Sequence, residues 1–421
     1  MNGKKVSFSH LSAVIELDNR LKKVGVYMPE KYDFDRIIDR SGTYSLKWKV
    51  SSKELPMWVA DMDFATAPEI VKAIQNRVAH GIFGYTTIPK EWSEAYIGWF
   101  AKRHDLKLKK EWLSFTTGVV PAIASMIRTL TKPGEKVLVQ PPVYNAFFNI
   151  IKDNGRETAE NELMLWDATY NVDFEDLEKK LSDPRTTLML LCNPQNPSGM
   201  LWDTDTLRRT GELCEKYGVT VISDEIHCDL TDPGYRYTPF SSVSDTCRDI
   251  SVTCIAPTKA FNLAGIHTAA VFASNAELHR KVRKGLNRDE VAEPGSFAID
   301  AVLVAYHEGE AWLDALREYT KSNREILRDY ITRELPEITI VQDHATYLVW
   351  LDCRKLTDER DDLADEIRQN TGLFISRGGM YGNAGKGFVR INLACPKSVL
   401  YQGLEKLKEG IRIYEQSPEK N

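Results

Sequence analysis

The middle of this chain alternates short apolar runs with longer amphipathic stretches, and this alternation limits the possible folds most strongly. The short runs are rich in β-branched residues, so they predict strands buried on both faces, as in a parallel sheet. The stretches between them have helical spacing, and Asp173 is placed to be the N-cap of one. The pattern predicts a three-layer α/β domain with a mostly parallel sheet. The expected strands are residues 137–140, 187–192, 219–223, 250–255 and 269–273, and the expected helices are residues 119–130, 174–181 and 203–217.

Near residue 295 the pattern changes to long helices, followed by two strands around an acidic helix. Pro336 is expected to end the second of the long helices, because proline cannot continue a helix interior. This part of the chain predicts a second, smaller α+β unit. The expected helices are residues 296–307, 310–334 and 358–370, and the expected strands are residues 347–351 and 388–393.

A chain of 421 residues is long enough for two domains. We expect a large domain over residues 61–295 and a small C-terminal domain over residues 296–421. Residues 1–60 have no strong pattern and are expected to pack with the small domain.

The composition excludes several classes of protein. With 43% hydrophobic residues, 27% charged residues and a net charge of −5, the chain has no bulk attraction to nucleic acid or anionic membranes. The seven cysteines are scattered and form no C-x-x-C motif, which argues against a disulfide framework and a cysteine-rich zinc site. No run approaches the ~20 apolar residues that span a bilayer, and the first 20 residues lack the apolar core of a secretory signal. We expect a soluble, cytoplasmic protein.

Three short segments that follow expected strands carry candidate chemistry. In the first, Lys259 precedes an apolar stretch that contains glycine. Such surroundings can desolvate an amine and lower its pKa toward nucleophilic use, although a lysine after a strand is more often a surface residue.

The second and third segments supply polar side chains. Asp224 and His227 follow the strand at 219–223, at the edge where α/β proteins bind ligands. The alternatives are a helix cap for Asp224 and a core histidine for His227. A metal site built on Asp224, His227 and Cys228 would lack a spaced cluster of further ligands elsewhere in the sequence, so no metal is expected. Residues 193–199, Asn-Pro-Gln-Asn-Pro-Ser-Gly, form a rigid turn that can aim two amides into the same crevice, or serve as a turn only.

Taken together, the order of these segments resembles one family. The motifs N-P-x-N-P-x-G, D-E-x-H and [ST]-K-x-F-N are similar to those of the fold-type-I pyridoxal-phosphate (PLP) enzymes, the aspartate aminotransferase superfamily. More narrowly, the chain resembles the cystathionine β-lyase/cystalysin subfamily of the MalY/PatB type. There is no G-x-G-x-x-G after a strand, so a Rossmann dehydrogenase is not supported. The resemblance runs from about residue 30 to residue 410 and also includes residues 56–64, 84–86, 117–120, 141–144 and 345–352.

The resemblance implies pyridoxal 5′-phosphate as the cofactor, held by Lys259 as a Schiff base. Lys259 would also move the α-proton, and Asp224 would keep the pyridine nitrogen protonated. Asn196 would bond the phenolic oxygen of the ring, and His227 stands where relatives often have a tyrosine with that role. Tyr144 would stack on the ring. The phosphate would be held by Gly118, Val119 and Val120 at a helix start, by Thr258, and by Tyr85 of a neighbouring subunit.

For the substrate, the resemblance implies that Arg390 clamps the carboxylate, with Ala60 and Asn196 beside it. Two positions depart from the family pattern. Ala256 replaces a common phosphate-binding serine, and His267 stands where aminotransferases often have an arginine; Thr258 or His267 would compensate.

The expected function is α,β-elimination from a cystathionine- or cysteine-type amino acid, which yields pyruvate, ammonia and a thiol. A thiol is a tolerable leaving group, which suits sulfur substrates to this chemistry. The alternative is a class I/II aminotransferase on the same scaffold, since fold does not fix function. A PLP-fold protein kept for protein interactions is disfavoured, because Lys259, Asp224 and Arg390 are all present. We expect a homodimer with shared active sites and a small-molecule substrate.

Overall fold

The computed structural model describes residues 32–357 and 361–416. From Phe34 onward the chain forms one compact unit. The N-terminal stretch in which no secretory signal was expected, and the start of the expected acidic helix, lie outside the described residues. The division at residues 60 and 295 stays a prediction.

The largest sheet has seven strands in the order β2-β10-β9-β8-β7-β3-β4. Pairing is parallel except around β10, which runs antiparallel to both β9 and β2. The mostly parallel sheet is confirmed, but the parallel interpretation of residues 269–273 was wrong. A strand buried on both faces has the same apolar composition in either direction, so sequence could not fix its orientation. The strands are β2 (Leu113–Thr116), β3 (Lys136–Val139), β4 (Glu157–Glu160), β7 (Thr186–Cys192), β8 (Thr220–Asp224), β9 (Ser251–Ile255) and β10 (Ala269–Phe272).

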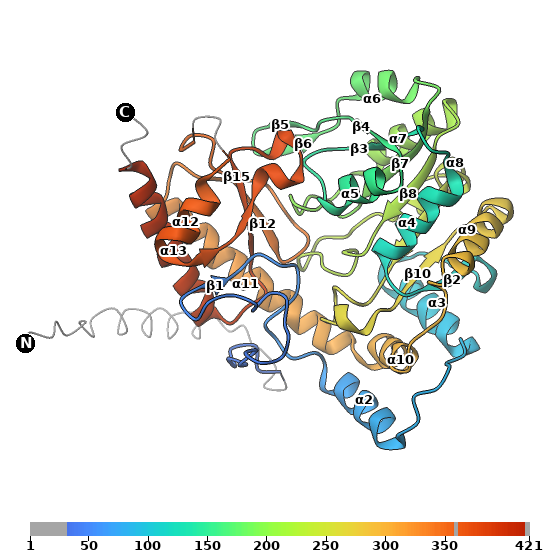
Figure 1. The fold of residues 1–421 in the computed structure, drawn as a ribbon, viewed down its shortest axis with the longest axis horizontal. Helices are drawn as coiled ribbons and strands as arrows, with labels where there is room; N and C mark the ends of the chain where they lie inside the picture. The colour runs from blue at the N-terminus through green and yellow to red at the C-terminus, as the bar shows by residue number, and fades with distance from the viewer. Residues whose placement is uncertain (1–31, 358–360, 417–421) are drawn as a thin grey trace, which may run out of the picture. The chain divides into compact units, whose positions relative to one another are not determined.

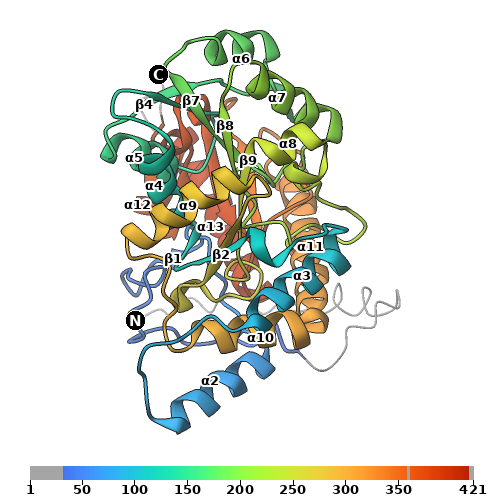
Figure 2. The ribbon, with the colours of Figure 1, turned by 90° about the vertical axis from the view of Figure 1, so that its right-hand side faces the viewer.

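Helices cover both faces of this sheet, which confirms the three-layer α/β fold (Figure 2). One apolar cluster joins the sheet to α4, α5 and α9, and another joins its opposite face to α6, α7 and α8. Asp173 caps α6 by accepting hydrogen bonds from the backbone of Glu175 and Asp176, as predicted. The helices are α4 (Val119–Leu130), α5 (Ala146–Asp153), α6 (Phe174–Leu181), α7 (Thr204–Lys216), α8 (Asp245–Asp249) and α9 (Ala276–Arg288).

The C-terminal part contains a four-stranded antiparallel sheet in the order β11-β12-β15-β14, with α12 and α13 beside it (Figure 1). Alternating side chains of β12 face opposite ways: Val349 and Leu351 pack with α11 and α13, whereas Trp350 packs with the core of the large sheet. The elements are α10 (Ala298–Glu308), α11 (Glu310–Glu334), β11 (Thr339–Ile340), β12 (Leu348–Asp352), α12 (Leu363–Thr371), β14 (Ser376–Arg377), β15 (Phe388–Asn392) and α13 (Lys397–Glu415).

The remaining elements are short or lie near the start of the chain. The strand β1 (Leu55–Pro56) pairs in parallel with β13 (Leu373–Phe374), which ties the early residues to the C-terminal part. No described helix is both long enough and apolar enough to cross a membrane. The others in the described residues are α2 (Pro68–His80), α3 (Lys90–His104), the hairpin of β5 (Met164–Trp166) and β6 (Thr169–Asn171), and the short 3-10 helices Lys110–Trp112, Phe240–Ser242, Ala264–Ile266, Gly378–Tyr381 and Asn383–Gly385.

The sheet order brings the carboxyl ends of several strands together. Because β10 is antiparallel to both its neighbours, β2 runs in the same direction as β9. The carboxyl ends of β2, β7, β8 and β9 therefore meet at one edge, where ligands bind in α/β folds.

Candidate active site

A cavity of about 410 Å³ lies at this edge of the sheet. Its walls come from the strand ends, from residues before α2 and from the C-terminal sheet, so segments more than 300 residues apart meet there. Every residue predicted for the site lines it except Tyr85. The predicted residues that line it are Ala60, Gly118, Val119, Val120, Tyr144, Asn196, Asp224, His227, Thr258, Lys259 and Arg390.

Lys259 lies half-buried in the turn that follows β9. Its Nζ atom donates a hydrogen bond to the backbone oxygen of Ala60 at 2.7 Å. Burial and, to a smaller extent, the positive charge of Arg390 lower the pKa of the lysine to about 8, although Asp61 and Asp224 oppose the shift. A substantial fraction of this amine is therefore uncharged, and so nucleophilic, near neutral pH.

Asp224 ends β8, and its side chain is buried in the cavity wall. Burial raises the pKa of its carboxyl group to about 6, although the backbone N–H of Ile226 and the charge of Lys259 stabilise the ionised form. The carboxylate therefore carries a negative charge at pH 7.

His227 is buried three residues further along the same loop. Burial and, to a smaller extent, the positive charges of Lys259 and Arg390 lower its pKa to about 3. The imidazole is therefore neutral, and its Nδ1 atom has no hydrogen-bond partner among the described residues.

Arg390, on β15, is held in place from two sides. Its Nη1 atom donates to Oδ1 of Asn196 at 2.8 Å, and its Nη2 atom donates to the backbone oxygen of Trp58 at 2.9 Å. The guanidinium lies over the ring of Tyr381, 4.9 Å from its centroid. Its Nε atom is buried and has no partner within the described part of the chain.

The N-terminus of α4 opens onto the cavity. Gly118 precedes the helix without a side-chain cap, so the first backbone N–H groups are left to a ligand or to solvent. Such N–H groups and the helix dipole favour an anion. Thr258 and the exposed His267 also line the cavity, whereas Ala256 does not.

The two predicted tyrosines differ in position. Tyr144 is half-buried in the cavity wall, and burial raises the pKa of its hydroxyl group, so it stays protonated. Tyr85 is fully exposed and does not line the cavity of its own chain.

Sequence reasoning missed several cavity residues. Trp58, Thr268, Ser376, Met380 and Tyr381 also line the cavity, and the hydroxyl of Thr268 is buried without a partner in the described structure. Trp58 lies within residues 56–64, one of the segments that carry the family resemblance. The others lie in loops or in elements of two to four residues, which are too short for a periodic signal, so only the folded chain reveals them.

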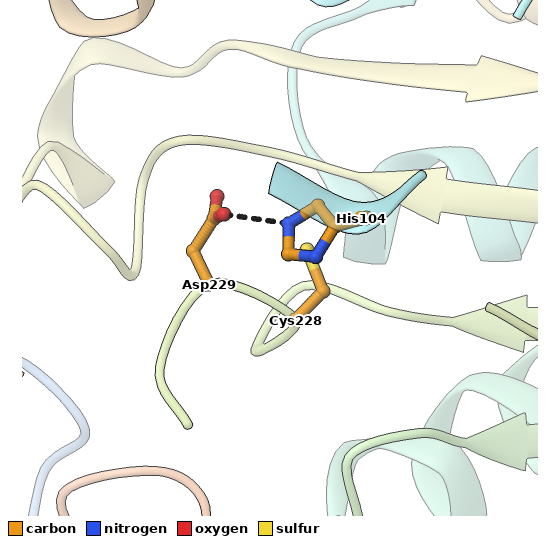
Figure 3. Close-up of side chains that lie close together, drawn as sticks. All are labelled: His104, Cys228 and Asp229. Carbon is orange, nitrogen blue, oxygen red and sulfur yellow. Dashed lines mark hydrogen bonds and ion pairs between the residues drawn. The ribbon is translucent and has the colours of Figure 1, made fainter. Parts of the chain in front are cut away.

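A second group of polar side chains lies outside this cavity. The potential ligand atoms of His104, Cys228 and Asp229 are within 4.8 Å of one another (Figure 3). Asp229 accepts hydrogen bonds from Trp99 Nε1 at 3.0 and 3.1 Å and pairs with Nε2 of His104 at 2.8 Å. These contacts account for the carboxylate oxygens without an ion.

Comparison with known proteins identifies the family. The family model of class I and II aminotransferases matches residues 53–407. This chain belongs to that family. It is 40% identical over 385 residues to cystathionine beta-lyase PatB of Bacillus subtilis, covering 90% of this chain and 100% of that protein. It is 34% identical over 391 residues to protein MalY of Escherichia coli, with 90% of this chain and 99% of that protein covered.

Solved structures show the same relationship. Cystalysin from Treponema denticola, which contains a pyridoxal 5′-phosphate cofactor, superposes with a TM-score of 0.87 and 32% identity, covering 91% of this chain and 99% of that one. The PLP-bound C-S lyase from Staphylococcus hominis gives a TM-score of 0.85 and 31% identity, covering 90% and 99%. The expected family and fold type are confirmed.

Proposed function

We propose that this protein is a PLP-dependent carbon–sulfur lyase of the cystathionine β-lyase type. The observation that carries the proposal is the position of the Lys259 amine in a cavity that also holds Asp224 and Arg390. These three groups supply a nucleophilic amine, a buried carboxylate and a carboxylate-binding cation. PLP chemistry on an amino acid uses a lysine for the Schiff base and a partner for the pyridine nitrogen, and a cation suits the substrate carboxylate.

The residues present fit the cofactor. Buried polar atoms are normally paired, yet His227 Nδ1, Thr268 Oγ1 and Arg390 Nε lack partners in the described cavity. A polar ligand there would satisfy them. The uncapped start of α4 would hold the phosphate through the backbone of Gly118 and Val119.

Other cavity residues would complete the binding site. Val120 and Thr258 would add phosphate contacts, and Tyr144 would lie against the ring face. Asn196 uses its Oδ1 atom for Arg390, which leaves its Nδ2 hydrogens to donate to the phenolic oxygen of the ring. His227, kept neutral by burial, would contact the same oxygen.

When bound, pyridoxal phosphate supplies an electron sink for the electron pair at the substrate α-carbon. Asp224 keeps a proton at the ring nitrogen, because its carboxylate is ionised at neutral pH and buried where charge interactions are strong. Lys259 takes the α-proton, since its lowered pKa leaves an uncharged amine to accept it.

Arg390 orients the substrate. Its guanidinium presents donors in a fixed plane, which suits a carboxylate, and Asn196 and Trp58 fix the direction of that plane. Ala60 lies beside it in the cavity wall. With the α-proton at Lys259 and the carboxylate at Arg390, the electron pair at the α-carbon would form a double bond to Cβ. The bond between Cβ and sulfur would break at the same time, and its electron pair would leave with the thiolate.

Elimination is favoured over transamination by the relatives. Proteins named as cystathionine beta-lyases match this chain over essentially their full length, at up to 40% identity. The solved structures with similar folds include PLP-bound C-S lyases. An aminotransferase remains the alternative, because both reactions begin with removal of the same proton.

We also propose a cytoplasmic homodimer. Tyr85 is fully exposed beside Ile82 and Phe83, which are exposed apolar side chains that a second copy of the chain would cover. Tyr85 would then reach the phosphate in the site of the neighbouring subunit. The cysteines are all unpaired and buried, which suits a reducing compartment.

The direct test is to supply cystathionine or S-methylcysteine and to measure released thiol and pyruvate. The proposal predicts equal amounts of both products. Conversion to a 2-oxo acid that retains the sulfur would instead indicate transamination.

A further inference from the structure

The segment Trp58–Phe64, named here the crossing segment, is neither helix nor strand, and its first three residues line the cavity. Both cations of the cavity donate to its backbone. Arg390 Nη2 donates to the oxygen of Trp58 at 2.9 Å, and Lys259 Nζ donates to the oxygen of Ala60 at 2.7 Å. The position of this segment therefore affects both functional side chains.

The crossing segment has few backbone hydrogen bonds of its own. Asp61 donates to Val59 at 2.9 Å, and Asp63 donates to Ala394 at 2.9 Å. Side chains donate hydrogen bonds to most of its other carbonyl oxygens, and two of these donors are the side-chain amides of Asn262 and Asn392. Its geometry therefore depends on those side chains rather than on a regular ladder.

Asn392 holds the middle of the crossing segment. Its Nδ2 group donates to the oxygens of Val59 at 2.6 Å and Asp61 at 2.7 Å, which flank Ala60. Its Oδ1 atom accepts from the backbone of Ala394 at 2.7 Å. The buried amide thus uses both donor hydrogens and its acceptor, and no shorter or charged side chain reproduces this set.

Asn262 holds the far end of the crossing segment. Its Oδ1 atom accepts from the backbone N–H of Met62 at 3.1 Å, and its Nδ2 group donates to the oxygens of Met62 at 3.1 Å and Phe64 at 2.9 Å. The backbone of Asn262 has φ of 54°, a left-handed conformation that asparagine tolerates better than most residues.

Each asparagine is covalently close to one of the two cations. Asn262 follows Lys259 by three residues in the same turn, and Asn392 follows Arg390 by two residues on the same face of β15. We propose that Asn262 and Asn392 are positioning residues that set the separation of Lys259 from Arg390 through the crossing segment. The inference rests on the proposed function only in that Arg390 binds the substrate carboxylate.

The test uses the PLP-loaded enzyme and 3-(methylthio)propionate, a thioether acid without an amine, which cannot react with the cofactor. Its binding is followed through the absorbance of the bound cofactor. Asn392→Ala and Asn262→Gly should each raise the dissociation constant about tenfold, as expected for loss of hydrogen bonds that orient the clamp. Glycine at 262 retains the left-handed backbone, so this variant folds even if the first does not.

Asn161→Ala is the matched control. Asn161 is as buried as Asn392 and also uses all three capacities, with Gln140, Asp173 and Asp176 as partners, but it does not line the cavity. It should lower the melting temperature while leaving the dissociation constant of the probe within about twofold.

If the asparagine variants lose stability like the control without weakening the probe, their role is structural and the inference is overturned. Probe binding does not require turnover, so the outcome is separate from that of the lyase assay. If the asparagine variants bind the probe weakly and the lyase assay shows transamination, the proposed function is overturned and the inference is retained. If the probe binds equally well to the Arg390→Lys variant, Arg390 does not bind the carboxylate, and the inference is overturned.

Discussion

Arg390 donates a hydrogen bond to Asn196 at 2.8 Å, although 194 residues separate them in the chain. The contact joins the C-terminal sheet to the loop after β7. It fixes the plane of the guanidinium, so the carboxylate site that we propose would be formed before a substrate arrives. Pre-formed geometry of this kind lowers the cost of ordering on binding.

Arg390→Lys should raise the substrate KM by roughly tenfold or more, because an ammonium group cannot reproduce the planar fork. Steady-state kinetics with cystathionine provide the measurement. Arg377→Lys is the matched control, since Arg377 lies exposed on the neighbouring strand β14, where it pairs with Asp361 and Asp365. An unchanged kcat/KM in Arg390→Lys would place the carboxylate elsewhere.

Asp224→Ala should retain the fold but lower kcat by about two to three orders of magnitude. The reason is that the variant lacks the buried negative charge that would keep the ring nitrogen of the cofactor protonated. Glu225→Gln is the control. Glu225 is the adjacent buried carboxylate. It accepts hydrogen bonds from the hydroxyl groups of Ser223 and Tyr237, and it does not line the cavity. A kcat near that of the wild type in Asp224→Ala would remove this residue from the mechanism.

The cofactor-free enzyme should bind pyridoxal phosphate covalently at a rate that rises with pH and is half-maximal near pH 8. The reason is that only the uncharged amine attacks an aldehyde, and burial lowers the pKa of Lys259 to about 8, so raising the pH through 8 removes its proton. Borohydride trapping followed by peptide mapping gives the rate. A half-maximal rate near the ordinary lysine pKa of about 10.4 would show that the amine is not desolvated. Trapping in Lys259→Ala would show that another lysine reacts.

Mixing Tyr85→Ala chains with Lys259→Ala chains should restore activity that neither variant has alone. In a twofold dimer with shared sites, each hybrid has one intact site, so random exchange gives about a quarter of wild-type activity. Native mass spectrometry establishes the exchange. Hybrids that form but remain inactive would argue against a contribution of Tyr85 across the interface.

Much of the fold followed from local sequence. The bounds of α4, α6 and α11 match the expected ranges, because strong helical spacing and the Asp173 cap define their ends. The helices α2 and α3 were not predicted. Nor was the pairing of β1 with β13, because two-residue strands have no periodic pattern and their pairing depends on the folded chain.

The site was predictable to a similar degree. Asp224 ends a strand, and Asn196 and Lys259 lie in the loops that follow its two neighbouring strands, so the strand ends bring all three to one edge of the sheet. Tyr381 and Ser376 could not be foreseen, since they reach the cavity only after the C-terminal sheet packs against the large one. The unpaired atoms of His227 and Arg390 are likewise visible only in three dimensions.

The central claim is elimination, and its most direct measurement is the number of turnovers without an acceptor. Purified enzyme with cystathionine as the sole substrate should release pyruvate, ammonia and homocysteine in equal amounts over many turnovers, with no 2-oxo acid added. An aminotransferase would stop after one turnover per site, with its cofactor in the amine form. Arrest of that kind, relieved by adding 2-oxoglutarate, would contradict the lyase account.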